Sequence, residues 1–298
     1  MTKKLHGIVV PFATPFAPDE GLDTERAKVL IDNLIDAGVH ALIILGDTGE
    51  FFTLTPEERL QFTEAAFRYI DGRVPVVIQP SAITTRETVN YAKHAKSLGA
   101  DALMVLPPYY RNSTSDEVYA HYAAVAEAVD LPIICYCLPG ISIEVMTPDF
   151  IAMLAEIDNI SFVKDSTGIL SRIREIKSAC GDRISVFVGG DTIAYDGLVA
   201  GAIGSIWGAA NFIPRQAVQL YELVCQEGDL AKACELWEKI FPICAFLEHN
   251  NYGASVKAAL ALVGLDMGPA RRPALPLGPE KLAGLAERLK GLGLLVKM

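Results

Sequence analysis

The sequence predicts an α/β fold, a (β/α)8 TIM barrel with a C-terminal helical extension. Short apolar runs alternate with helical stretches along most of the chain. The runs are nearly continuous, as expected for parallel strands that are covered on both faces. Eight of them follow one another, at residues 6–12, 41–46, 74–79, 102–107, 132–138, 160–165, 184–190 and 202–207. Eight strands that are each followed by a helix close into a parallel barrel.

The segments between the runs carry helix signals. Apolar residues recur at helical spacing in 24–37 and 114–129. The segments 55–58 and 84–87 match the capping-box pattern, and Thr147-Pro148 opens a further helix. Three glycines lie just past predicted helix ends, where a left-handed residue is favoured: Gly38, Gly99 and Gly181.

One unit is expected rather than two independent domains. A chain of 298 residues suits a single barrel with additions. We predict that residues 1–225 form the barrel and that 226–298 form a helical extension of the same unit. Helices are expected near 214–227, 229–248, 250–263 and 279–292.

Composition excludes several classes of partner. The net charge is −10 and no basic cluster is longer than a pair such as Arg271-Arg272, so no nucleic acid is expected to bind. No apolar run approaches the roughly 18 residues that a membrane span needs. The six cysteines include no CxxC pair, which indicates reduced thiols in a cytoplasmic protein.

The sixth apolar run ends in a lysine, Lys164. In this fold the active site lies where the strands end. Burying an unpaired ammonium is costly, and desolvation favours the neutral amine, which is the form that attacks a carbonyl. The alternative is a salt bridge to the adjacent Asp165 or to another strand carboxylate.

Other strand ends bring further functional groups to the same rim. The second run ends in a glycine-bracketed turn, 46–50, with the sequence GDTGE, which could receive a carboxylate, although an ordinary turn explains it nearly as well. The fourth run ends in PPYY at 107–110, and the fifth ends in YCLPG at 136–140. The seventh ends in GGD at 189–191, and the eighth contains GAIGS at 201–205.

In this order and spacing, the motifs resemble the family of dihydrodipicolinate synthase and N-acetylneuraminate lyase. The resemblance runs from Gly7 to the final helix. It implies that Lys164 condenses with pyruvate or another 2-oxo acid to form an imine, with Tyr136 relaying protons. It also implies that the Thr48 hydroxyl and the backbone of the turn from Gly46 to Gly49 hold the substrate carboxylate.

The resemblance further implies an assembly and a second part of the site. Tyr110 matches the tyrosine that family members lend to a neighbouring subunit's site, which implies a homotetramer built as a dimer of dimers. Ordinary interface packing is the alternative for this residue. Three residues match positions that meet the remainder of the substrate: Gly190, Asp191 and Ser205.

No metal or cofactor is expected. The five histidines are scattered and no HxH or carboxylate–histidine cluster occurs. An imine is itself an electron sink, so it permits aldol cleavage, condensation or β-elimination. The resemblance therefore implies a metal-independent carbon–carbon or carbon–oxygen lyase of the class I aldolase type.

Two positions depart from the pattern of the synthases. Asp47 stands where they carry a threonine that links two tyrosines. A carboxylate beside an anionic substrate is costly unless it is protonated or paired, which makes Asp47 a candidate acid/base residue; alternatively, it caps the turn and faces away. The synthases also carry an arginine shortly after the proline of the fifth strand end, and 140–144 contains no cation.

These departures separate the family from the substrate. The expected activity is a sugar-acid aldolase, a dehydratase or a deaminase rather than a standard synthase. An authentic 4-hydroxy-tetrahydrodipicolinate synthase and a catalytically silent barrel are the alternatives. A barrel isomerase that binds phosphate at 189–190 and 201–204 is a further one, but it gives Lys164 and Tyr136 no function.

Overall fold

The eight strands form a closed parallel barrel in chain order from β1 to β8. This computed structural model describes residues 5–294. Every predicted run contains a strand, so the (β/α)8 fold is confirmed. The strands are β1 (Gly7–Pro11), β2 (Ala41–Ile44), β3 (Val76–Ile78), β4 (Ala102–Val105), β5 (Ile133–Cys137), β6 (Ile160–Asp165), β7 (Ser185–Val188) and β8 (Gly204–Ile206).

A helix follows each strand, and three more close the chain. The helices are α1 (Thr24–Asp36), α2 (Pro56–Ile70), α3 (Thr85–Leu98), α4 (Ser115–Ala128), α5 (Pro148–Leu154), α6 (Ser171–Cys180), α7 (Ala194–Val199), α8 (Pro214–Tyr221), α9 (Leu230–Glu248), α10 (Tyr252–Leu262) and α11 (Pro279–Gly291). A π-helical segment, Glu222–Glu227, extends α8 to the end predicted for that helix. The C-terminal helical region is thereby confirmed.

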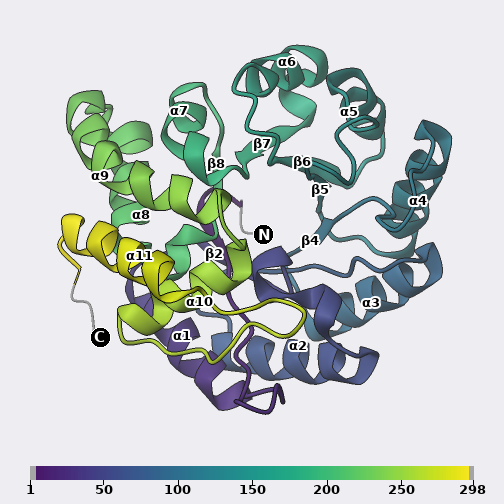
Figure 1. Ribbon diagram of the computed structural model, residues 1–298. Coiled ribbons are helices and arrows are strands. Elements are labelled where there is room, and N and C mark those ends of the chain that lie inside the picture. Colours follow the sequence, from purple (N-terminus) through teal and green to yellow (C-terminus); the bar gives the residue numbers. More distant parts are fainter. Residues whose placement is uncertain (1–4, 295–298) are drawn as a thin grey trace. The chain divides into compact units, whose positions relative to one another are not determined.

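The chain divides into two compact units. One contains Pro75–Ile206 and therefore carries β3 to β8 with α3 to α7 (Figure 1). The other combines Gly7–Val74 with the chain from Trp207 onward, and carries β1, β2, α1, α2 and α8 to α11. We call them the central unit and the terminal unit. The predicted boundary at residue 225 stays a prediction.

Local sequence signals account for the starts of several helices. The capping box at Thr55 is formed in both directions, with Glu58 reaching back to the Thr55 amide. Thr84 caps α3, but the Glu87 carboxylate accepts from the Thr84 hydroxyl instead of its amide. A second complete box, at Thr114, was not predicted. These caps satisfy amides that the helices leave open.

The structure bears on two expectations from the sequence, which concern the cysteines and the lack of a membrane span. All six cysteines are free thiols; four are buried, whereas Cys225 and Cys234 are exposed. In residues 5–294, none of the helices combines the length and the apolar character that crossing a bilayer requires.

Candidate active site

Lys164 lies on β6 with its side chain inside the central unit. Its neighbours in register are Tyr136 on β5 and Phe187 on β7. The lysine is 5% exposed and Tyr136 is 2% exposed. The Lys164 Nζ atom lies 4.0 Å from the centroid of the Tyr136 ring. The structure therefore brings together the predicted nucleophile and the predicted proton relay.

The carboxylate next to Lys164 in sequence faces the other way. Asp165 Oδ2 lies 2.8 Å from Arg172 Nε of α6, and Asp165 Oδ1 accepts a hydrogen bond from the Thr167 amide. Successive strand residues point to opposite faces. Because Asp165 faces the helix layer, Lys164 faces the barrel interior. The alternative of a Lys164–Asp165 salt bridge is wrong, since Asp165 pairs with Arg172.

Arg172 also fixes the loop that follows Tyr136. Its Nη2 atom donates to the Met146 carbonyl at 2.7 Å, and Nε binds Asp165. The guanidinium thus joins the end of β6 to the end of the loop between β5 and α5. Arg172 was not predicted as a functional residue, although it stands only seven residues after Asp165 in the sequence.

Gly189 and Ser166 complete the surroundings of the lysine. A Cβ atom at Gly189 would collide with Ser166 Oγ and would lie 2.8 Å from Lys164 Cε. Ser166 Oγ is buried and accordingly lies beside the lysine side chain. Glycine is required at 189 because the lysine and the serine occupy the space of a side chain. Ser166 follows Lys164 by two residues, so the strand alternation alone could have identified it.

The predicted carboxylate turn belongs to the terminal unit. It is a short 3-10 turn, Asp47–Gly49, preceded by Gly46. A Cβ at Gly46 would lie 2.7 Å from the Pro11 side chain, and one at Gly49 would lie 3.1 Å from the Phe12 carbonyl oxygen. Close packing therefore excludes a side chain at Gly46 and leaves only a tight contact for one at Gly49, whatever the turn binds.

Two left-handed residues bracket this turn. Leu45 has φ 61° and Glu50 has φ 53°, although neither is glycine. Such conformations cost roughly 1–2 kcal/mol per residue and persist only where the surroundings fix them. Strained backbone of this kind concentrates at functional sites. Thr48 lies in the middle of the turn with a buried side chain, whereas Asp47 opens the turn and is half-buried.

The N-cap of this turn is Gly46, and Asp47 is the first residue within the turn. Asp47 is therefore not its N-cap residue. The Asp47 carbonyl accepts the Glu50 amide at 2.9 Å, and the Gly46 carbonyl accepts the Gly49 amide at 2.9 Å. These two bonds close the turn. The role of the Asp47 carboxylate stays a prediction.

The remaining predicted residues fall in different places. Gly190 and the buried Asp191 follow β7, and Asp191 opens a 3-10 turn, Asp191–Ile193. Tyr110 is 78% exposed, unlike the buried Lys164 and Tyr136. Its predicted role in a neighbouring subunit stays a prediction.

Ser205 lies on the opposite face of the sheet from Lys164. It pairs with Val188, and Val188 pairs with Asp165, so all three point toward the helix layer. The Ser205 hydroxyl donates to the Val188 carbonyl at 3.3 Å. On the Lys164 face, β8 presents Gly204 instead. The structure does not bring Ser205 to the lysine.

The described part of the chain contains no cluster of side chains that could bind a metal ion. In residues 5–294, no three His, Cys, Asp or Glu side chains gather so that they could hold a metal ion. His121, the most buried histidine, accepts or donates a bond to the Thr85 hydroxyl at 2.9 Å. Its burial lowers the pKa to about 4, so it is a neutral structural residue at pH 7.

Comparison with known proteins assigns the family. The chain is 37% identical over 291 residues to an uncharacterised DapA-like lyase of Halobacterium salinarum, covering 98% of this chain and 95% of the relative. It is 35% identical over 290 residues to the 4-hydroxy-tetrahydrodipicolinate synthase of Syntrophobacter fumaroxidans, covering 97% and 99%. The structure of the chloride-inhibited dihydrodipicolinate synthase of Acinetobacter baumannii complexed with pyruvate matches with a TM-score of 0.93 and 33% identity, covering 98% of this chain and all of that one. The family model of the dihydrodipicolinate synthetases matches residues 4–292. This chain belongs to the dihydrodipicolinate synthetase family of lyases.

Proposed function

We propose that the protein is a lyase that forms a Schiff base between Lys164 and pyruvate or another 2-oxo acid. The observation that carries this proposal is the placement of Lys164. The lysine faces the barrel interior, its Nζ lies over the Tyr136 ring, and the neighbouring carboxylate is turned away and bound by Arg172. The pyruvate complex of the related Acinetobacter enzyme supports a 2-oxo acid as the substrate.

The proposed reaction begins at the amine. Lys164 Nζ attacks the C2 carbonyl of the 2-oxo acid and forms a carbinolamine. Loss of water then gives an imine, and the Tyr136 phenol, in register with the lysine, moves the protons in both steps. Once protonated, the imine accepts the electron pair of a neighbouring bond, which permits aldol cleavage, condensation or β-elimination.

Other residues would bind the substrate. The Thr48 hydroxyl and the backbone of the turn from Gly46 to Gly49 would receive the carboxylate. Gly190 and Asp191 would meet the rest of the molecule, and Tyr110 would serve the site of a neighbouring subunit in a homotetramer. Ser205 has no part in this mechanism, because it faces the helix layer.

The substrate is expected to differ from that of a standard synthase. The loop at 140–144 carries no cation that could hold a dicarboxylate partner, and Asp47 replaces an uncharged residue. We therefore favour an aldolase, dehydratase or deaminase of an uncharged or hydroxylated 2-oxo acid. The relatives named 4-hydroxy-tetrahydrodipicolinate synthase favour that synthase as a second candidate. A product screen with hydroxylated 2-oxo acids, run beside the synthase assay, separates the two.

Reductive trapping tests the shared chemistry. The protein is incubated with pyruvate and sodium borohydride, digested, and mapped by mass spectrometry. Imine formation loses one water and reduction adds two hydrogens, so the expected adduct has the mass of pyruvate less one oxygen atom, on Lys164. Absence of an adduct with pyruvate and with a panel of 2-oxo acids would contradict the proposal and favour a silent barrel.

Three further properties stay predictions. Chelator treatment would test the absence of a metal requirement, light scattering would test the tetramer, and cell fractionation would test the cytoplasmic location.

A further inference from the structure

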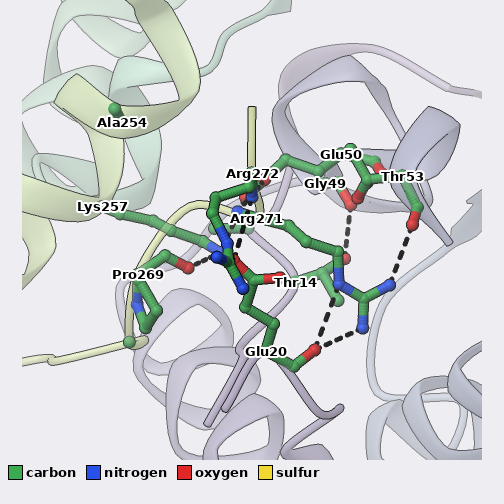
Figure 2. A network of polar contacts seen from close by, with 12 residues as sticks. Thr14, Glu20, Gly49, Glu50, Thr53, Ala254, Lys257, Pro269, Arg271 and Arg272 are labelled. Atoms are coloured by element: carbon green, nitrogen blue, oxygen red, sulfur yellow. Dashed lines mark hydrogen bonds and ion pairs between the residues drawn. The ribbon is translucent and has the colours of Figure 1, made fainter. Parts of the chain in front are cut away.

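Glu50, the residue that ends the turn, is fixed by a buried cation. Its side-chain Oε1 atom lies 2.7 Å from Lys257 Nζ of α10, and the two side chains are 5% and 3% exposed. Lys257 also donates to the Pro269 carbonyl at 2.8 Å and lies over the Phe16 ring, 4.1 Å from its centroid. Figure 2 shows this lysine reaching from α10 into the polar network.

A segment near the C-terminus supplies the second contact to Glu50. The Arg271 amide donates to Glu50 Oε2 at 2.9 Å, and the Arg271 guanidinium donates to the Thr53 carbonyl (Figure 2). The guanidinium also donates to both carboxylate oxygens of Glu58. We call residues 266–272 the C-terminal strap. The strap lies against Phe16, because a Cβ at Gly268 would collide with the Phe16 carbonyl oxygen.

The turn is held from its other side as well. Thr14 Oγ1 donates to the Gly49 carbonyl at 2.6 Å. The Glu50 carbonyl accepts hydrogen bonds from the amide and the hydroxyl of Thr53, each at 2.9 Å. The left-handed conformation of Glu50 is therefore determined by contacts to its carbonyl, its carboxylate and the preceding residue.

We propose that Lys257 is a positioning residue for 2-oxo acid binding: its ion pair with Glu50 fixes the left-handed end of the turn, and so fixes the groups that receive the substrate carboxylate. The lysine acts through Glu50 and does not contact the substrate. This inference rests on the function proposed above, since it assumes that the turn binds the carboxylate.

A buried ion pair is suited to this task because it specifies geometry more than it stabilises the fold. Removing two charges from water costs much of what their attraction contributes, and apolar replacements are often equally stable. The ion pair nevertheless demands a defined position of both charged groups. A binding turn must be held to within a fraction of an ångström for productive geometry.

Protonation of Lys257 gives a second readout. Burial lowers its pKa to about 8; the facing Glu50 carboxylate opposes this shift, and Arg271 adds to it. The Arg271 guanidinium is itself bound by the Glu58 carboxylate and by the Glu20 backbone carbonyl. As the pH rises through 8, the ammonium loses its charge and its hold on Glu50 weakens. The half-saturating concentration of the 2-oxo acid is therefore expected to rise in this range.

The experiment measures the rate of imine trapping at increasing pyruvate concentrations with sodium cyanoborohydride. At pH 7, Lys257→Met is expected to raise the half-saturating pyruvate concentration about tenfold or more, while the limiting trapping rate changes less than about threefold. Lys257→Arg, which retains the cation, is expected to restore binding and to remove the pH dependence above 8. Arg272→Met is the matched control, because Arg272 also belongs to the strap but forms only an exposed ion pair with Glu20. This variant should leave the half-saturating pyruvate concentration and the limiting trapping rate unchanged.

The outcomes separate the inference from the proposed function. No trapping in the wild-type protein would overturn both. Normal wild-type trapping with an unchanged half-saturating concentration in folded Lys257→Met would overturn the positioning role alone. If Lys257→Met does not fold, Glu50→Gln and the double variant Glu50→Gln/Lys257→Met provide the same test. An unchanged half-saturating concentration in either, at a normal thermal midpoint, would also overturn it.

Discussion

The central and the terminal unit each bury one lysine in a similar setting, and the two lysines differ in their carboxylate neighbours. Lys164 is 5% exposed with its Nζ 4.0 Å from the centroid of Tyr136, and Lys257 is 3% exposed with its Nζ 4.1 Å from the centroid of Phe16. Lys257 forms an ion pair with Glu50, whereas the carboxylate nearest to Lys164 in sequence is bound by Arg172. Burial and an aromatic neighbour are thus common to the proposed nucleophile and to the proposed positioning residue. The difference between them is where two carboxylates are bound: Glu50 pairs with Lys257, whereas Asp165 pairs with Arg172.

The largest expected effect comes from replacing each of the two buried lysines in turn. Lys164→Met is expected to reduce imine trapping by about 10⁴-fold or more, because the nucleophile itself is lost. Its thermal midpoint should stay close to wild type, since Met suits the apolar surroundings of Tyr136 and Phe187. Lys257→Met should still be trapped at saturating pyruvate. Trapping of Lys164→Met at the wild-type rate, mapped to another residue, would refute the assignment.

A second substitution tests whether imine formation depends on the exact position of the Lys164 side chain. Gly189→Ala places a methyl group against Ser166 Oγ and 2.8 Å from Lys164 Cε. We expect the limiting trapping rate to fall by roughly 10- to 100-fold, since a displacement of about 1 Å can cost 10²-fold. Gly291→Ala is the matched control, because no atom lies within 4 Å of the added Cβ there. Equal rates in the two variants would mean that the lysine tolerates displacement.

The smallest expected effect is on stability at alkaline pH. The pKa of Lys257 is lowered by burial from 10.5 to about 8, so between these values the unfolded chain binds a proton that the folded protein has lost. Stability therefore rises with pH in this window, by at most about 1.4 kcal/mol per pH unit. Urea unfolding of wild type and of Glu50→Gln/Lys257→Met from pH 7.5 to 10 should show this gain in the wild type only. A constant difference between the two would show that Lys257 does not titrate there.

The barrel and its strands were predictable because each strand is a continuous apolar run, and Lys164 was conspicuous because it ends one of them. The orientation of individual side chains was harder. Ser205 was predicted to meet the substrate, but its register with Val188 places it on the helix-facing side. An offset of one residue moves a strand side chain to the other face, and sequence spacing does not fix that offset between neighbouring strands.

The contacts around the turn could not be predicted at all. Nothing in the periodicity of the sequence pairs Glu50 with Lys257, because their contact depends on the tertiary fold. The left-handed conformation of Leu45 and Glu50 was equally hidden, since glycine is the usual signal for it and neither residue is glycine. Only the close packing of Gly46 against Pro11 has a visible sequence signal, which is the pair of glycines at either end of the predicted turn.

The C-terminal strap has a consequence for the order in which the protein matures. Arg271 lies 221 residues after Glu50, and yet its amide binds the Glu50 carboxylate. Domains fold from the N-terminus during synthesis at roughly 5–20 residues per second. During synthesis, the contact between Arg271 and Glu50 therefore cannot form until long after the turn itself has been made. A nascent chain that has completed all eight strands but has not yet released Arg271 is accordingly expected to lack the contact that fixes Glu50 at the end of the turn.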